Sequence, residues 1–506
     1  MKKIFTITLC IASSLYLNAQ TTTDALRYSV NDIQGTARYR ALSGAFGALG
    51  GDISAVSINP AGSSVFTSSH ATFTLESNSN KNETSYFNGN QSNSNSNIDF
   101  TQGGAVFLFK NNNDSSPWKK FSVGITYENF KNYDNDWSSS GTSQSSIDNY
   151  FLANAQGLRL DEISALPGET TTEAYSEIGA IYGYQNQQAF LGYDSYILEP
   201  ETFDDSNTVY TSNIAPGSFN QAYNYSATGY NGKISFNASA QYTDNFYIGL
   251  NLNSHFINYD KFTSFYETNS NANTVVDEVL FDNTLSTTGN GFSFQIGSIW
   301  KITPELRAGF TYDSPTWLTI EEETTQYLET HVIDDTNGDF YQIVNPNIIN
   351  VYPSYRLQTP AKITTSIAYV FGQNGLISFD YSTKNYSNTK FKPTSDAYFN
   401  QQNNIMSNEL TNANSYKIGA EYKLKQFSFR GGYRFEESPY KDGETIGDLN
   451  GYSFGLGYDF GNTILDLTYS NSKQSTNNRF VNVGLANFTT VENTNSNVTL
   501  SLGFKL

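Results

Sequence analysis

The feature that most constrains the fold is a two-residue alternation of apolar, often aromatic side chains with small or polar ones, which dominates from about residue 69 onward. Successive side chains of a β-strand point to opposite faces, so this period predicts strands with one apolar face each. The C-terminal third shows it most clearly, with Tyr416, Ile418, Ala420, Tyr422 and Leu424 on one parity and Lys417, Gly419, Glu421 and Lys423 on the other.

The composition agrees with an all-β chain. The 506 residues include 36 Tyr and 36 Phe but only 2 Met, and rings fit a pleated surface better than a helix. The net charge of −19, with only 29 Lys and Arg, lacks the basic footprint of a nucleic-acid binder. We therefore expect no nucleic-acid partner.

The first residues are typical of a targeting segment. Lys2 and Lys3 precede an apolar stretch that ends near Leu17, and the small Ala19 offers a cleavage point, so residues 1–19 are predicted to be a signal peptide. The only cysteine, Cys10, lies within it, which excludes disulfides and thiolate metal sites from the mature chain. No later run of 18 apolar residues predicts a membrane-spanning helix.

The lengths of the connections distinguish a soluble sandwich from a membrane barrel. Tight turns alternate with long loops, which is typical of outer-membrane barrels, where the turns gather at one end and the loops at the other. The strands are expected at 69–77, 98–110, 119–130, 226–242, 245–267, 283–301, 305–321, 355–371, 375–388, 412–424, 426–436, 450–460, 463–473 and 495–506. The last of them carries an apolar stripe from Val498 to Leu506, as the final strands of bacterial barrels commonly do.

We therefore predict a transmembrane β-barrel of about 14 antiparallel strands over residues 69–506, in the outer membrane of a Gram-negative bacterium. Its partners would be outer-membrane lipid and, during biogenesis, the barrel-assembly machinery. Residues 77–97 are interpreted as a solvated, low-complexity loop. Residues 20–68 are rich in Gly and Ala and do not alternate, and a barrel this wide cannot be filled by its own side chains. They are predicted to form a hatch that plugs the lumen.

One stretch in this segment, from Ala41 to Gly62, resembles the N-terminal hatch of the FadL/TodX family of outer-membrane transporters for hydrophobic compounds, in particular a branch common in Bacteroidetes. The segments 306–315 and 429–434 are also similar to that family. The resemblance implies a fourteen-stranded barrel and passive, hatch-gated diffusion of a long-chain fatty acid or an aromatic hydrocarbon. It also implies a lateral exit beside a kinked third strand.

The family motif corresponds here to Asn59, Pro60, Ala61 and Gly62. Proline forces the preceding asparagine into an extended conformation and offers no amide proton, whereas Gly62 permits a turn. An ordinary turn that leads into the first strand is the alternative to a gate. Gly124 could mark the kink of the third strand, because glycine inside a strand often accompanies a bulge.

The loop 131–225 contains the only helices that we expect. Ile147, Tyr150 and Phe151 fall on one helical face after the N-cap Ser146, and Ile178, Ile181 and Tyr182 repeat that spacing. These faces either pack the loop on the barrel rim or, as the family resemblance implies, form a groove that captures the substrate.

Three further patterns indicate other functions more weakly. Residues 451–455 match a hydrolase nucleophile motif but lie in an alternating strand, so we expect no enzyme and no cofactor. Asp335, Asn337 and Asp339 resemble part of a calcium loop, whereas an acidic surface loop explains them as well. His331 is the only imidazole expected in an outer loop, which leaves a haemin receptor as an alternative, together with a general diffusion porin.

Several inward charges are expected to form ionic ladders between neighbouring strands and to fill the lumen. They are Lys417, Glu421, Arg430, Arg434, Asp459 and Asp466.

Overall fold

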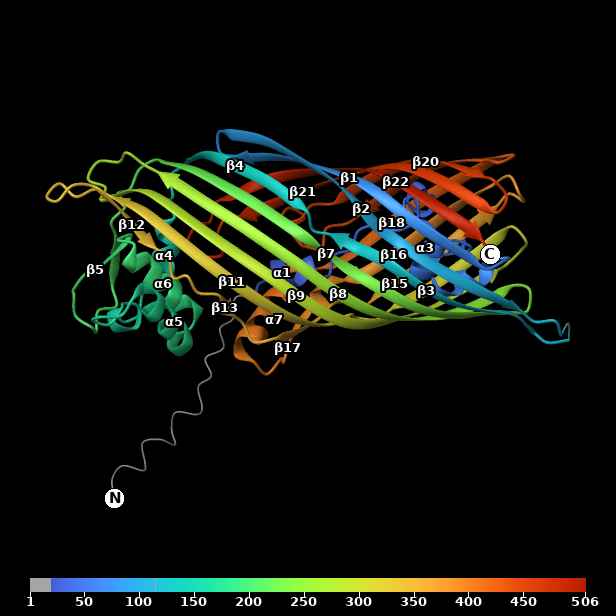
Figure 1. Cartoon of the computed structure of the whole chain (residues 1–506), viewed down its shortest axis with the longest axis horizontal. Coiled ribbons are helices and arrows are strands. Elements are labelled where there is room, and N and C mark those ends of the chain that lie inside the picture. The colour runs from blue at the N-terminus through green and yellow to red at the C-terminus, as the bar shows by residue number, and fades with distance from the viewer. Residues whose placement is uncertain (1–19, 114) are drawn as a thin grey trace, which may run out of the picture.

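A computed structural model describes residues 20–113 and 115–506, and the predicted signal peptide lies outside them. In this part of the chain, antiparallel strands close a fourteen-stranded barrel, which confirms the predicted fold class (Figure 1). No helix of the described residues is long and apolar enough to cross a membrane.

Ten of the fourteen positions in the wall are single strands: β1 (His70–Tyr86), β2 (Gly89–Lys110), β7 (Phe219–Tyr242), β8 (Phe246–Thr268), β9 (Val276–Lys301), β18 (Asn412–Leu424), β19 (Phe427–Glu436), β20 (Leu449–Asp459), β21 (Thr463–Arg479) and β22 (Phe488–Lys505). Four are pairs of strands: β3 (Trp118–Asn132) with β4 (Asn135–Ser143), β10 (Leu306–Asp313) with β11 (Trp317–Val332), β14 (Tyr355–Gln358) with β15 (Lys362–Val370), and β16 (Gly375–Asn385) with β17 (Lys390–Lys392). The short strands β12 (Phe340–Val344) and β13 (Asn350–Val351) pair with β11, as β14 does, and β5 (Leu198–Pro200) pairs with β6 (Tyr210–Ser212).

The apolar residues of the alternating strands point outward, as a membrane-facing wall requires. Phe429 and Tyr433 on β19 are 49% and 47% exposed on the outer face, whereas Arg430 between them is 8% exposed. Along β1, the outward residues change from Phe73 and Leu75 to serines and the charged Lys81 and Glu83 further on. The apolar band therefore covers only part of the height of the wall, and the rest of β1 continues beyond it.

This extension corrects the interpretation of residues 77–97 as a loop. They form a long hairpin, with β1 and β2 paired up to Tyr86 and Gly89, and β1 is also paired with β22 on its other side. Asn and Ser have low strand propensity, but pairing on both edges outweighs it. Other strands are also longer than predicted. β9 begins at Val276 and β21 ends at Arg479. Both continue beyond the apolar band, where the outward residues no longer alternate in hydrophobicity.

Two predicted strands, 305–321 and 355–371, are each broken in the middle. The interruptions fall at Pro315 and Pro360, which lie close together because Thr359 donates its N–H to the carbonyl of Thr316. A proline cannot donate a ladder hydrogen bond, so the strand breaks there.

The helices form two groups. The N-terminal segment contains α1 (Thr22–Arg27), α2 (Ala37–Ala41), α3 (Ile53–Ile58) and the 3₁₀ helix η1 (Pro60–Val65), and it lies within the barrel (Figure 1). At the end of the barrel opposite the C-terminus lie α4 (Asp148–Ala155), η2 (Leu160–Glu162), α5 (Thr171–Tyr182) and α6 (Tyr184–Asp194).

The expectation of helices only within 131–225 is wrong, because the four helical elements of the N-terminal segment lie outside that range, as do η3 (Tyr386–Asn388) and α7 (Ala397–Glu409). The boundaries of that loop also shrink, because β4 and the start of β7 belong to the wall, which leaves residues 144–218 between them. The helix α7 packs Phe399 and Met406 into a cluster with Leu26 of α1, so it is held by tertiary contacts rather than by a strong sequence pattern.

Candidate functional site

The N-terminal segment contacts the wall on several sides. The helix α2 packs against β19 to β22, whereas η1 packs against β3, β7, β8 and β9. Polar wall side chains bind its backbone directly: the Asp380 carboxylate accepts the N–H groups of Phe46 and Gly47, each at 2.9 Å. These contacts hold the segment across the width of the lumen.

The motif that begins with Asn59 binds the N-terminal segment directly to the barrel wall. The Asn59 amide donates to the carbonyl of Gly47 at 2.8 Å and to that of Ser298 in β9 at 2.9 Å, and its oxygen accepts the N–H of Ala61. The carbonyl of Pro60 accepts a hydrogen bond from Asn237 in β7 at 3.0 Å. The residues of the motif therefore join two parts of the segment to two strands.

Glycine is required on the wall at this contact. A Cβ at Gly297 would overlap the Asn59 side chain, and one at Gly249 would overlap the backbone of Pro60. Neither the Asn59 side chain nor the Pro60 backbone can move aside without loss of contacts. Glycines at the inward positions of β8 and β9 therefore make room for the segment.

A buried ionic network joins the segment to the opposite wall. Glu421 binds Arg38 of α2 at 2.9 Å and Arg430 at 2.6 Å, and Arg430 also binds Asp466 at 2.5 Å. This confirms the ionic ladder for Glu421, Arg430 and Asp466, and it adds an arginine that sequence reasoning did not place. Removal of one partner from such a buried network costs about 3–5 kcal/mol, so the network fixes the position of α2.

Two cavities lie on either side of the stretch from Thr21 to Gln34. The larger, of about 1140 Å³, is at the end where α4 to α6 gather, and we call it the vestibule. The smaller, of about 170 Å³, is lined by residues such as Tyr28, Ile58 and Pro360 and lies toward the Asn59 motif. The stretch that carries α1 therefore separates the two.

Aromatic side chains dominate one wall of the vestibule. Trp137 of β4 stacks on Tyr225 at 5.2 Å between ring centroids, and the Tyr225 hydroxyl lies 3.0 Å from that of Tyr259. Arg27 of α1 lies over the Tyr259 ring, with its Cζ atom 4.4 Å from the centroid. None of these residues was singled out from the sequence, because they come from four separate elements.

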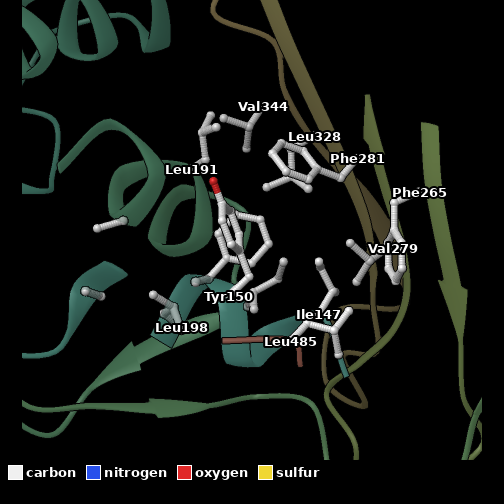
Figure 2. Close-up of a cluster of buried hydrophobic side chains, with 14 of the residues drawn as sticks. Ile147, Tyr150, Leu191, Leu198, Phe265, Val279, Phe281, Leu328, Val344 and Leu485 are labelled. Atoms are coloured by element: carbon white, nitrogen blue, oxygen red, sulfur yellow. The ribbon is translucent and has the colours of Figure 1, made fainter. Parts of the chain in front are cut away.

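Apart from Tyr150, the predicted capture residues divide into two groups. Ile147, Phe151 and Ile178 are buried in a cluster that packs α4 to α6 against wall residues such as Phe265 and Phe281. Figure 2 shows part of this cluster, with Ile147, Phe265 and Phe281 labelled. Ile181 and Tyr182 are exposed at the end of α5. The three buried positions therefore pack the helices against the wall, whereas the two exposed positions neither pack there nor line the vestibule.

Tyr150 differs from its neighbours because it also lines the vestibule. Burial raises the pKa of its hydroxyl well above the usual value, so the group stays protonated and donates to Gln188 Oε1 at 3.0 Å. Its ring contacts Phe281 of β9 at a centroid distance of 5.9 Å. Tyr150 is therefore the one predicted capture residue with a face toward the cavity.

We predict separate effects for Tyr150 and Phe151. Tyr150→Ala should weaken binding of a hydrophobic ligand by up to about 3 kcal/mol, from the apolar area of one ring. Phe151→Ala should instead destabilise the packing of α4 to α6 against the wall by about 3–5 kcal/mol. Ligand titration and limited proteolysis would measure the two effects. Unchanged affinity in a folded Tyr150→Ala protein would assign Tyr150 to packing alone.

The backbone pairing of the wall is interrupted beside the third strand. β2 and β3 pair from Lys110 and Lys120 to Gln102 and Glu128, and no further β2 pairing with β3 or β4 occurs among the described residues. Side chains bridge the remaining height, beginning with Asn132, which donates to Asp99 at 2.8 Å. We call this stretch, between β2 residues 89–101 and β3–β4 residues 129–143, the seam.

The register of β3 is even at Gly124, which stands between Val106 and Asn237. It shifts at Trp118–Lys120 and, beside the seam, at Asn129–Lys131. Gly124 therefore carries no bulge, and the kink that the family resemblance implies stays a prediction. Valine and the neighbouring backbone leave no room for a Cβ there without adjustment, which explains the glycine through packing.

Residues of the calcium-like loop, His331 and the hydrolase-like motif each contact other groups of the protein. Asp334 accepts the N–H groups of Thr336 and Asn337, and Asp339 that of Asp334, so these carboxylates shape the turn that holds Asp335. His331 Nδ1 lies 2.7 Å from Asp277. Ser453, in the hydrolase-like motif, donates to the carbonyl of Ala41 at 2.9 Å, a contact between the wall and the N-terminal segment.

The fold and the filled lumen define an outer-membrane β-barrel of a Gram-negative bacterium. Residues 204–505, more than half of the chain, match the family described as outer membrane protein transport protein (OMPP1/FadL/TodX), and the chain belongs to this family. No curated protein matches the sequence.

Solved structures share the fold. A FadL homologue from Pseudomonas aeruginosa is 12% identical, with a TM-score of 0.53 over 94% of this chain and 99% of its own. The Pseudomonas putida toluene transporter TodX is 12% identical, with a TM-score of 0.51 over 94% of this chain and 100% of its own.

Proposed function

We propose that this protein carries hydrophobic small molecules across the outer membrane by passive diffusion through a lumen gated by the N-terminal hatch. The observation that carries this proposal is the vestibule, a large tyrosine-lined cavity that ends at a segment filling the lumen below it. Membership of a family of outer-membrane transport proteins supports it. The substrate would be a fatty acid or an aromatic hydrocarbon, and the toluene transporter with the same fold supports the second type.

The path would begin in the vestibule and pass the stretch around α1 into the smaller cavity. Below that cavity, Asn59 and Pro60 bind the hatch to β7 and β9, and these contacts support a role for the two residues in the gate. A substrate would then leave sideways through the seam, where β2 has no backbone-to-backbone hydrogen bonds with β3 or β4 among the described residues. The outward Ile98 and Phe100 beside the seam are 77% and 45% exposed, which suits an exit into lipid.

Two alternatives have weaker support. A haemin receptor would need an available axial ligand, but the His331 ring is paired with Asp277 and packs against Tyr341 at 4.8 Å between centroids. A general diffusion porin would need an open lumen, and the buried N-terminal segment argues against one.

Uptake measurements test the proposal. Purified protein in liposomes should accelerate entry of a hydrophobic fluorophore such as N-phenylnaphthylamine into an acceptor enclosed in the vesicles. It should not cause swelling in a small sugar such as arabinose, because the hatch blocks a water-filled path. Swelling in arabinose without faster fluorophore entry would contradict the proposal and support a porin.

The orientation in the membrane is a further proposal. The long connections, including residues 144–218, all extend from the end opposite the C-terminus, so we expect that end to face outward. Protease added to intact cells should then cut within the loops at this end, such as the turn around Gly338. Cleavage at the tight turn around Gly372 instead would reverse the orientation.

A further inference from the structure

Three cationic side chains lie together on the outer face of the wall. Arg356 of β14 and Lys390 of β17 are exposed, and Lys392 of β17 is half-buried. β14 pairs with β17, and Arg356 stands in register opposite Lys392. The three side chains point outward, because the intervening Leu357 and Phe391 are buried on the inner side. We call Arg356, Lys390 and Lys392 the basic patch.

The basic patch lies at the edge of the apolar band. Ile363 and Ile367 of β15, nearer the tight turns, are exposed on the outer face. Trp317 of β11 stands in register with Gln358, which on its other side is in register with Lys390. Aromatic residues form a girdle where a barrel wall leaves the hydrocarbon. The patch therefore begins at the level of the lipid headgroups, and in the orientation proposed above these belong to the outer leaflet.

The three cations have no anionic partner among the described residues. No ion pair or side-chain hydrogen bond joins any of them to another residue in this part of the chain. Glu321, the next outward carboxylate of β11, lies two residues beyond Thr319, the register partner of Arg356. Lys362 of the neighbouring β15, in contrast, binds Asp313 at 2.9 Å. The outward cations are therefore left to the surroundings of the barrel.

This arrangement is unfavourable without an anion. Like charges directly opposite each other on neighbouring strands are destabilising, and Arg356 and Lys392 are such a pair. Lys390 is a diagonal neighbour of Arg356, and diagonal neighbours lie about 7–8 Å apart, so the long side chains of all three can reach one anionic group. A guanidinium binds two phosphate oxygens at once, and lysines bind phosphate as point charges. A phosphate at this level would therefore remove the repulsion.

We propose that the basic patch binds a phosphate group of an outer-leaflet lipid, with the Arg356 guanidinium on two phosphate oxygens and the two lysines beside it. The lipid matches both parts of the surface. Its phosphate neutralises the cations, and its acyl chains cover the exposed Trp317 and Ile363 directly below them. A soluble anion would match only the first part. This proposal is independent of the proposed function, because the patch lies outside the lumen.

Native mass spectrometry of the full-length protein in detergent tests the proposal. The probes are monophosphoryl lipid A and the same lipid after removal of its phosphate. We expect the phosphorylated lipid to bind the wild type more tightly, since each Lys or Arg near a charged headgroup contributes a factor of about 5 in affinity. In Arg356→Gln/Lys390→Gln/Lys392→Gln, its affinity should fall by about 30- to 100-fold. The dephosphorylated lipid should bind this variant as it binds the wild type.

Three scattered cations supply the matched control. Lys81 on β1, Lys110 at the end of β2 and Lys425 in the turn between β18 and β19 are exposed and lie on separate elements. Their replacement by Gln makes the same change in net charge, so the phosphorylated lipid should bind this control as it binds the wild type. If the variant of the basic patch does not fold, Arg356→Gln alone should show a loss of about fivefold.

Three results would overturn the proposal. Equal affinity of the two lipids for the wild type would show that the phosphate is not recognised. An equal loss in the scattered control would assign the effect to net charge rather than to the patch. Binding of inorganic phosphate as tight as that of the phosphorylated lipid would indicate a site for free ions.

Discussion

Deletion of residues 20–66 should convert a nearly silent protein into one with large, steady conductance in planar bilayers. The segment contacts β3, β7 to β9 and β19 to β22, so its removal leaves the lumen empty across its width. Side chains of the wall cannot fill a fourteen-stranded barrel by themselves, and water and ions would enter. Single-channel recording of the wild type and the deletion protein measures the difference.

A point variant separates the body of the hatch from its gate. Asn59→Ala with Pro60→Ala removes the hydrogen bonds to the carbonyls of Gly47 and Ser298 but leaves the Arg38–Glu421–Arg430 network intact. We expect it to change uptake of the hydrophobic fluorophore more than it changes conductance. Large conductance in the wild type, or equal conductance with and without residues 20–66, would exclude a plug.

Cross-linking of the seam should abolish most uptake of a hydrophobic substrate. Asp99→Cys with Asn132→Cys places two thiols where the side chains now meet at 2.8 Å, and a reducible bis-methanethiosulfonate would join them. The mature chain would contain no other cysteine if the predicted cleavage after Ala19 occurs. A lateral exit requires β2 and β3–β4 to separate, so the covalent bridge should block it, and a reductant should restore uptake.

The bonded half of the same two strands supplies the control. Phe109 and Phe121 are a register pair on the outer face, and the bridge between cysteines at these positions should leave uptake unchanged. If the bridge across the seam also leaves uptake unchanged, the substrate does not leave sideways, and a path past the hatch along the barrel axis would replace the lateral exit.

The family resemblance, the strand alternation and the paired charges could be predicted correctly from the sequence. Each depends only on residues that are near one another in the chain or on the two-residue period of a strand. Tyr416, Ile418 and Tyr422 predict an outward face without knowledge of any partner, since the period of a strand is a property of its own backbone. Opposite charges at equal distances from a tight turn, such as Glu421 and Arg430, meet across the hairpin β18–β19 for the same reason. These elements could be read from the sequence.

The seam, the vestibule and the second half of β1 depend on partners that are distant in the chain. Asn78 to Asn82 become a strand because β22, more than 400 residues later, pairs with them. Trp137, Tyr225 and Tyr259 line one cavity only because β4, β7 and β8 are neighbours in the closed wall. Local propensity contains no information on such pairing, and for Asn and Ser it favours a loop.

The sequence by itself therefore determined the class of fold, the outward face of the strands, an N-terminal segment distinct from the wall, and the family. Only the tertiary structure decided where the wall lacks backbone pairing, that the register is even at Gly124, and which side chains face the vestibule. The physical reason is that alternation reports the two faces of each strand, whereas closure of the barrel sets the neighbours of each strand and thus the shape of the lumen.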